Sequence, residues 1–520
     1  MDARFPDSRS ARVLPLLGLF ALTLVVFWPS FQYGFVSDDF VQLTRNSWER
    51  VWSTWREEGF RRPLDELFFL SFWKAFGFHA LPYRIFLCGL YFLNTVLVYR
   101  LTTSLLRDRL SGFAVAAMFA ANLVQFRNVY WVSCAIGLME TMLFLVALLC
   151  LLRRLDGGPA GWSALALAVA TLGVITTKEH LAMFPLVAGL TAAFRQLVLR
   201  GSLTRADLWS IGRSTAIFWV VPIFFVGARL VLKIVSTGGL ECPYDPTRCL
   251  GADSSDPFFV SLWGVHLLRN LLQHLYWNLG NFGIYWLDGI LNPNAGKLEW
   301  LGVGPTQYAL IATYGILLAA AYWWLRRLVP WGTLVLSGLW FIVLLAPVLV
   351  LPNHSYPYFS AFASVGLGIA VVMPFSMLRV SGHPYGATVG LGLLLSLFLA
   401  TSLYWSHKNL STHLITSTSR FLIGFEAHLK FLHPSVPPGA TLVFLNIDGW
   451  HLGYRLAPAF MYGDPSIRTL AKGDVAVQNG RISVKEQVAL DPHRTLVFVL
   501  TPDGLRDVTT EFFSVYDHPT

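Results

Sequence analysis

Charged residues are scarce in this 520-residue sequence, where Asp, Glu, Lys and Arg together make up 13%. An ordinary soluble domain carries about twice that share, or about 25%. Hydrophobic residues instead reach 55%, and the mean hydropathy is +0.54. This composition excludes an ordinary soluble protein and predicts many membrane-spanning helices.

Features typical of nucleotide- or nucleic-acid-binding proteins are also missing. The sequence has no Gly-rich phosphate loop, no basic low-complexity tail and no repeat with a period of about 20–50 residues. Its net charge of +9 has a simpler explanation, because many of the basic residues form short clusters between apolar segments. That distribution follows the positive-inside rule of membrane proteins, so no nucleic-acid partner is expected.

Only five cysteines are present. Cys88, Cys134 and Cys150 lie within apolar segments and fit as small core residues. Cys242 and Cys249 share a polar loop, where we expect a disulfide because the topology places this loop in an oxidising compartment. A metal pair is disfavoured, since no second Cys/His pair lies near them in the sequence.

Apolar segments of spanning length predict about eleven transmembrane helices. The first covers 13–30 and follows Arg4, Arg9 and Arg12, which are expected to keep the N-terminus in the cytoplasm as part of an uncleaved anchor. The others are expected near 82–104, 110–127, 130–152, 161–178, 181–199, 211–235, 306–325, 332–351, 360–378 and 386–405. Most arginine clusters then fall on the cytoplasmic side, which supports this count.

Two long loops, 32–80 and 236–305, are expected on the outer side. Within the first, residues 64–78 are apolar but too short to span, which favours a helix lying in the membrane interface. Residues 258–287 in the second loop predict interfacial or re-entrant helices, with a hidden pair of spans as the alternative.

The composition changes after Trp405, so the chain divides into a membrane domain, 1–405, and a C-terminal domain, 406–520. An amphipathic helix is expected at 410–432, and buried strands at 440–446 and 495–500. The predicted fold class is therefore an α-helical polytopic membrane protein with a small C-terminal extracytoplasmic α/β domain.

Two adjacent carboxylates, Asp38 and Asp39, directly follow the first predicted span. Charges at a membrane exit are costly and need a reason. A solvated charged loop explains them as well as a catalytic carboxylate does when they are considered alone.

Four other outer segments, one of them in the same loop as Asp38, also carry unusual polar or aromatic residues, and each has a local explanation such as a turn ion pair or interfacial aromatics. Their coincidence at one membrane face favours a site instead. The segments are Arg61-Arg62-Pro63-Leu64, Arg127–Ser133, Lys178-Glu179-His180 and Asn353–Tyr358.

The order and spacing of these segments resemble the GT-C superfamily of integral-membrane glycosyltransferases, in particular the protein O-mannosyltransferase-like group of glycosyltransferase family 39. The resemblance covers roughly residues 13–200, with a weaker match at 351–366. The tetratricopeptide repeats of some relatives are absent, and residues 406–520 take their place. The matching segments are Asp38-Asp39, Arg62-Pro63-Leu64, Trp131-Val132-Ser133, and Lys178-Glu179 ahead of Pro185.

The resemblance implies that a sugar moves from a polyprenyl-phosphate or polyprenyl-diphosphate carrier to an acceptor hydroxyl outside the cytoplasm. A carboxylate can deprotonate that hydroxyl, so Asp38 or Asp39 is expected as the general base. Cationic side chains stabilise the carrier phosphate. The residues expected to contact the donor phosphate or sugar are Arg62, Lys178, Glu179, His354 and Tyr356.

The sequence departs from the family pattern between the third and fourth spans. Relatives often place His-Pro and a Glu there, whereas this chain has Asn122-Leu123, with Arg127 at the Glu position and Glu140 deeper in the span. A divalent ion such as Mg²⁺ or Mn²⁺ would thus have Asp39 as its only acidic candidate. We expect catalysis that is metal-independent or weakly metal-stimulated.

Two alternatives to an enzyme stay open. A transporter of amphiphilic lipids is expected to show repeats and polar groups near the bilayer midplane, which this sequence lacks. A non-catalytic scaffold that binds partners through residues 406–520 fits the missing Glu. The expected partners of the enzyme are the sugar donor, membrane lipids, and a glycan, lipid or exported protein as acceptor. The expected location is the bacterial inner membrane, with the site facing the periplasm or exterior.

Overall fold

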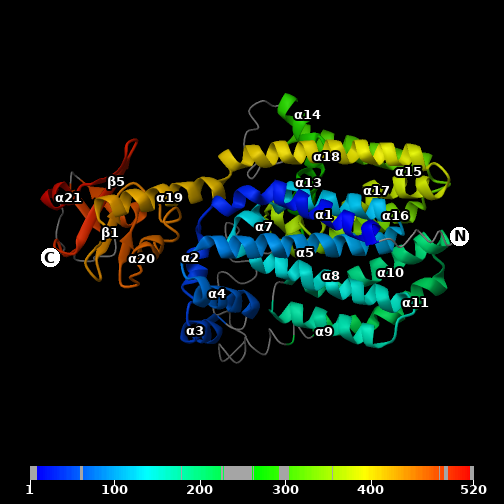
Figure 1. Ribbon diagram of the computed structural model, residues 1–520, viewed down its shortest axis with the longest axis horizontal. Helices are drawn as coiled ribbons and strands as arrows, with labels where there is room; N and C mark the ends of the chain where they lie inside the picture. Colours follow the sequence, from blue (N-terminus) through cyan, green and yellow to red (C-terminus); the bar gives the residue numbers. More distant parts are fainter. Residues whose placement is uncertain are drawn as a thin grey trace.

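The computed structural model describes residues 9–58, 62–176, 179–223, 227, 261, 263–291, 304–353, 355–478, 481–484 and 490–515. These residues form a mostly helical body and a small sheet near the C-terminus. In Figure 1 the sheet lies beyond one end of the body, and the N-terminus lies at the opposite end.

Within the described residues, six helical segments are long and apolar enough to cross a membrane. The chain is therefore compatible with a multi-pass membrane protein. A seventh arises if α6 (Arg109–Ala121) and the segment Leu123–Tyr130, which bend by 47°, count together. The six are Val13–Gln32, Ala80–Leu106, Val132–Leu155, His180–Arg200, Trp331–Leu349 and Pro384–Thr412.

Other predicted spans are helical, but their helices are shorter or less apolar than the six above. The helices α9 (Gly161–Thr176) and α17 (Ser364–Val380) are apolar but shorter, and α15 (Pro305–Trp324) is less apolar. The predicted span 211–235 is only partly described, with α11 (Arg205–Thr215) at its start. The count of about eleven spans stays a prediction.

The spanning segments contain the long helices of the body. These are α1 (Arg9–Phe27), α5 (Ala80–Leu106), α8 (Ala135–Leu155), α10 (Phe184–Arg200), α16 (Trp331–Leu349) and α18 (Pro384–Thr412). Shorter helices occupy the connections, and they cover most of the described residues of two predicted non-spanning segments, 64–78 and 258–287. The shorter helices are α2 (Asp38–Leu43), α3 (Trp48–Glu58), α4 (Pro63–Phe76), α7 (Phe126–Tyr130), α13 (Val265–Leu279) and α14 (Ile284–Leu291).

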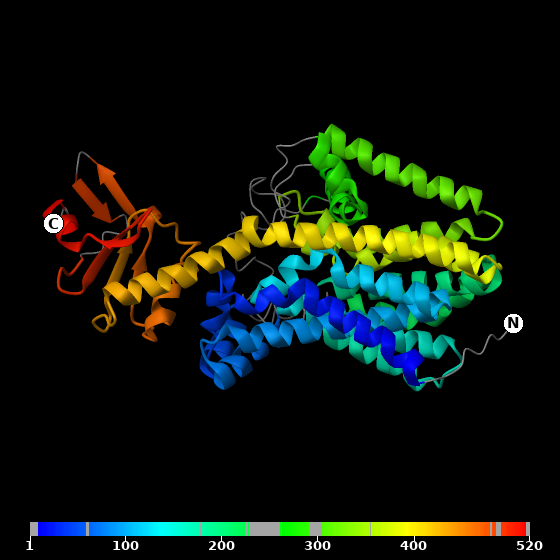
Figure 2. The same cartoon turned by 45° about the horizontal axis from the view of Figure 1, so that its top comes forward.

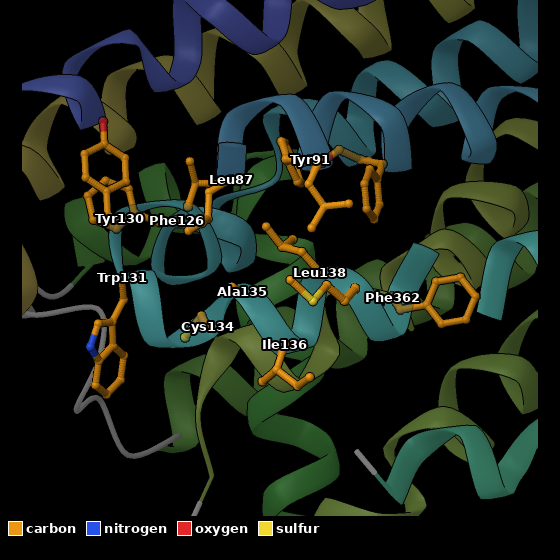
Figure 3. Close-up of a cluster of buried hydrophobic side chains, with 14 of the residues drawn as sticks. Leu87, Tyr91, Phe126, Tyr130, Trp131, Cys134, Ala135, Ile136, Leu138 and Phe362 are labelled. Carbon is orange, nitrogen blue, oxygen red and sulfur yellow. Dashed lines mark hydrogen bonds between the residues drawn. The ribbon is translucent and has the colours of Figure 1, made fainter. Parts of the chain in front are cut away.

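The core of the body lies where α5 packs against α6 and α8. Lipid is as apolar as these side chains, so close packing and hydrogen bonds fix the helix pairs. Asn94 of α5 donates to the carbonyl of Leu138 at 2.9 Å. A Cβ on Gly112 would lie 2.1 Å from Thr103 Oγ1, so the α5–α6 approach requires glycine. Figure 3 shows the neighbouring cluster, in which Tyr130 and Trp131 point in different directions.

Buried amides hold the bend between α6 and α7. Asn122 Oδ1 accepts from Val124 N at 3.1 Å and from Asn281 Nδ2 at 2.9 Å. Asn278 Nδ2 donates to Ser360 Oγ at 2.8 Å, which ties α13 to the loop before α17. The predicted continuous span at 110–127 is therefore broken at Asn122, because these amides satisfy the backbone groups that the bend releases.

The helices α18 and α19 (Leu414–Leu432) form the arm that leads from the body to the sheet, coloured yellow to orange in Figure 2. The helix α18 continues to Thr412, past the compositional change at Trp405. The helix predicted at 410–432 corresponds to α19.

The C-terminal domain contains a four-stranded sheet in the order β2-β1-β5-β6. The strands are β1 (Thr441–Phe444), β2 (Arg468–Leu470), β5 (Thr495–Thr501) and β6 (Gly504–Asp507), with β6 antiparallel to β5 and the other pairs parallel. The two predicted strands are confirmed as β1 and β5 in its centre. The remaining elements are β3 (Val475–Gln478), β4 (Arg481–Val484), α20 (Ala457–Tyr462) and α21 (Thr509–Val515).

Candidate functional site

Asp39 is fully buried, and backbone and side-chain donors occupy both oxygens of its carboxylate. Its Oδ1 accepts from Ser133 N at 2.7 Å and from Ser133 Oγ at 2.6 Å, while Oδ2 accepts from Val36 N at 3.0 Å. Burial raises the pKa of Asp39 to about 6, and the buried guanidinium of Arg84 opposes this rise. Asp39 thus fastens the start of α2 to the loop before α8.

The loop that carries the two aspartates is clamped from both sides at Gly34. Arg84 of α5 donates to the Gly34 carbonyl at 2.6 Å, and the Gly34 N–H donates to Ser419 Oγ of α19 at 2.8 Å. Ser37 then adopts a φ of 44°, a left-handed value that residues other than glycine rarely adopt. This strained turn leads directly into Asp38 and Asp39.

Asp38 differs from its neighbour because it is only partly buried. Burial raises the pKa of Asp38, while a hydrogen bond from Tyr454 and the positive charge of Arg127 act in the opposite direction. A carboxylate with a raised pKa is a stronger base than an exposed one. Of the two adjacent aspartates, Asp38 therefore combines accessibility with basicity.

Arg127 of α7 is surrounded by three aromatic rings. Its guanidinium carbon lies 4.2 Å from the ring centre of Trp131, 4.5 Å from that of Tyr356 and 5.1 Å from that of Tyr358. Such cation–π contacts stabilise a positive charge and restrict its position. The rings come from two loops far apart in the sequence, so the aromatic cage joins them beside Asp38.

Tyr454 brings the C-terminal domain to the same place. Gly453, Tyr454 and Arg455 all have positive φ, at 58°, 54° and 73°. Two of them are not glycine, so this turn stores conformational strain. Arg455 anchors the turn, because its Nε donates to Asp474 Oδ2 at 2.7 Å.

Aromatic packing fixes this domain against the loop of Asp38. The ring of Phe460 on α20 lies 5.9 Å from Phe40, 5.7 Å from Phe78 and 5.6 Å from Trp73. A Cβ on Gly453 would lie only 2.3 Å from the Phe40 ring, so the turn approaches α2 as closely as glycine allows. Figure 1 shows α2 and α4 at the end of the body that faces α20.

A second polar group lies at the same end of the helices. His180 Nδ1 and Glu140 Oε2 are 3.3 Å apart in a pocket that Asn128 and Tyr358 also line. The pocket has a volume of about 40 Å³, which is enough for a few waters but not for a sugar. His274 is fully buried, and that burial, with the charge of His180 as the lesser cause, lowers its pKa to about 3.

The structure brings Asp38 and Tyr356 together around Arg127, and no hydrogen bond or ion pair joins Arg62 to these described residues. Arg62 is exposed at the start of α4, and its side chain makes no hydrogen bond or ion pair with another described residue. Glu179 begins the short 3-10 helix Glu179–Met183. Lys178, His354, Cys242 and Cys249 lie outside the described residues.

Sequence reasoning included the loop of Arg127 among the unusual outer segments and noted Arg127 as a departure from the family pattern, but it gave Arg127 no role. It missed Tyr454, Arg84 and the Glu140–His180 pair. The nearest signal for Arg127 was the clustering of Trp131, Tyr356 and Tyr358 in two outer loops. Tyr454 carried no comparable signal, because its role depends on how the C-terminal domain packs.

A metal ion does not fit the described part of the chain. Nowhere in it do three or more His, Cys, Asp or Glu side chains come together in a way that could hold one. Both oxygens of Asp39 accept hydrogen bonds from protein donors. We therefore derive no step through Mg²⁺ or Mn²⁺.

No protein-family model matches this sequence, and no curated protein matches it either.

Proposed function

We propose that this chain is a membrane glycosyltransferase that moves a sugar from a polyprenyl-phosphate-linked donor to an acceptor hydroxyl. The observation that carries the proposal is the pairing of Asp38, a partly buried carboxylate with a raised pKa, with the caged cation Arg127. Both lie at the ends of long apolar helices, where a donor with a lipid tail and a polar head would reach them.

The proposed reaction needs one base and one cation. Asp38 accepts the proton of the acceptor hydroxyl while the oxygen of that hydroxyl attacks the anomeric carbon of the sugar. The bond between that carbon and the phosphate oxygen breaks, and its electron pair leaves with the phosphate. Arg127 stabilises the negative charge that develops on this leaving group, and exposed Arg62 is a further candidate for the carrier phosphate.

Asp39 takes a supporting role in this proposal. Its oxygens already accept three hydrogen bonds, and full burial keeps an acceptor hydroxyl away from it. It positions Asp38 by holding α2 against the loop of Ser133. The finer description of the fold, a GT-C arrangement with about eleven spans, belongs to the same proposal, and the helices α9, α15 and α17 at predicted positions support it.

A non-catalytic scaffold is the second candidate function, and two observations favour it. Tyr454 already occupies Asp38 with a hydrogen bond, and the neighbouring pocket at Glu140 is too small for a sugar. A catalytic site would have to open at the Tyr454 turn to admit substrate, whereas a scaffold could keep this contact permanently.

Transfer of radiolabelled sugar from polyprenyl-phosphate donors, measured with the purified protein in lipid nanodiscs, tests the proposal. The wild-type chain should bind donor and transfer sugar, and Asp38→Asn should bind donor without transfer. The matched control is Asp503→Asn, which removes an exposed carboxylate in the turn between β5 and β6. If the wild-type chain neither binds nor transfers any donor, the scaffold becomes the better account.

A further inference from the structure

A second cavity lies far from Asp38, at the opposite end of the helical body (Figure 1). It has a volume of about 640 Å³ and sits between α1, α5, α8 and α9. Its walls include the last turn of α5 and the last turns of α8, which point toward the end of the body that carries the N-terminus (Figure 1). Ligand pockets usually have about 300–1,000 Å³, so this cavity can hold a small molecule or a lipid headgroup.

Three arginines line this cavity, namely Arg100 of α5, Arg109 of α6 and Arg153 of α8. Asp156 also lines it, but an ion pair with Arg195 compensates its charge. The positive-inside rule explains arginines at this end of the helices, yet it does not explain why three helices direct them to one cavity. The result is a concave site with positive charge.

Hydroxyl groups add hydrogen-bonding capacity to the wall. Tyr99, Thr103 and Ser104 of α5 lie on it. Thr103 Oγ1 is buried and has no hydrogen-bond partner within the described part of the chain. This oxygen lies against Gly112 of α6, where a Cβ would come within 2.1 Å of it, so it belongs to the α5–α6 contact and not to the cavity surface.

The rest of the wall is apolar. The apolar residues that line the cavity include Leu16 of α1, Leu97 of α5 and Leu149 of α8. These three helices are long and apolar enough to cross a membrane. Leu14 and Leu17 on α1 are exposed beside it, as expected for residues that contact lipid. One side of the cavity therefore suits a phosphate group, and the other suits an alkyl chain.

We propose that this cavity binds the phosphate of an anionic phospholipid among Arg100, Arg109 and Arg153, with an acyl chain along Leu16, Leu97 and Leu149. Basic pockets between transmembrane helices are suited to anionic headgroups, because arginine donates to phosphate oxygens in a fixed geometry. The inference does not depend on the proposed sugar transfer. A soluble phosphate shares the same headgroup chemistry, so the test separates the two sources.

Native mass spectrometry of the protein released from nanodiscs of phosphatidylglycerol and phosphatidylcholine measures the retained lipid. The wild-type chain should retain phosphatidylglycerol selectively, and the double variant Arg100→Gln/Arg153→Gln should retain at least about tenfold less. The matched control is Arg154→Gln, because Arg154 neighbours Arg153 but donates to the Gly158 carbonyl, and it does not line the cavity. The control should retain lipid as the wild type does.

Two further measurements complete the test. Arg100→Lys/Arg153→Lys keeps both charges and should restore much of the binding, which distinguishes lost recognition from lost folding. Titration with inorganic phosphate should show no saturable binding at millimolar concentration, whereas phosphate binding that equals lipid binding would overturn the lipid assignment. Equal phosphatidylglycerol retention by the wild type and the folded Gln double variant would overturn the site itself.

Discussion

The two ends of the helical body handle charge in opposite ways. At the end that meets the C-terminal domain, Asp39 is buried with three donors and Arg127 is enclosed by three rings. At the other end, Arg100 and Arg153 are exposed around an open cavity. Fixed, partnered charges suit chemistry that needs a defined geometry, whereas exposed cations suit attraction of an anion.

The largest effect on stability is expected from Arg84→Met, which removes the cation beside Asp39 at the end of the body that meets the C-terminal domain. Removing the guanidinium leaves the buried carboxylate of Asp39 uncompensated, so the variant should lose about 3–5 kcal/mol of unfolding free energy. Denaturant unfolding in detergent micelles measures this loss. The exposed Arg154→Gln serves as control and should change stability by less than about 0.5 kcal/mol.

The stability lost in Arg84→Met should increase with pH. Folding raises the pKa of Asp39 from 3.8 to about 6, so the folded state binds this proton more tightly than the unfolded state does. The resulting contribution to the free energy of unfolding is fully present below pH 3.8 and is lost as the pH rises through about 6. Without Arg84 this pKa rises further, so the difference between variant and wild type should be smaller at pH 5 than at pH 8. A difference that does not change with pH would show that Arg84 does not act on Asp39.

Arg127→Gln tests whether the caged cation serves the reaction. We expect sugar transfer to fall by about 100-fold, as is typical when one stabilising donor of a developing negative charge is removed. Because Arg127 lowers the pKa of Asp38, the acid limb of the pH–activity profile should also move to higher pH. The control is Arg45→Gln, which removes a cation that follows α2 and pairs with Glu66. Unchanged transfer by Arg127→Gln would separate the cage from catalysis.

Phe460→Ala tests the docking of the C-terminal domain. Its ring is partly buried among Phe40, Phe78 and Trp73, so truncation should cost about 1–3 kcal/mol. Hydrogen exchange should increase in α2 and in the turn at Tyr454, while α5 keeps its protection. The exposed Phe431→Ala on α19 is the matched control. Equal exchange in both variants would mean that Phe460 does not hold the domain in place.

Tyr454→Phe should have the smallest effect on stability, because it removes one hydroxyl and keeps the ring. Loss of this hydrogen bond should cost about 0.5–1.5 kcal/mol. Since the bond lowers the pKa of Asp38, and does so by more than the charge of Arg127, the acid limb of the activity profile should move to higher pH by at least as much as in Arg127→Gln, if the proton acceptor is Asp38. A shift to lower pH would contradict the assigned contact.

The sequence alone predicted the elements whose signal is local. The apolar run at 82–104 became α5 (Ala80–Leu106), and the buried strands at 440–446 and 495–500 became β1 and β5. Buried parallel strands are continuous apolar runs, so periodicity and flanking Gly, Pro and Asp suffice to find them.

The site was less predictable because its geometry comes from distant segments. Which of two adjacent aspartates is buried depends on Ser133, Arg84 and the strained turn at Ser37, and none of these shows in the local pattern. The contact of Tyr454 with Asp38 joins residues more than 400 positions apart through the packing of Phe460. The break of the predicted 110–127 span likewise depends on Asn278 and Asn281 of a different element.

A side-by-side measurement of Asp38→Asn and Asp39→Asn in nanodiscs tests the central claim most directly. Transfer from a polyprenyl-phosphate sugar and the melting temperature are recorded for both variants and the wild type. We predict that Asp38→Asn loses at least about 100-fold in transfer with an unchanged melting temperature. Asp39→Asn should keep transfer within about fivefold and melt at a lower temperature, because its amide N–H₂ would face the Val36 N–H. Full transfer by Asp38→Asn in a folded protein would contradict the account.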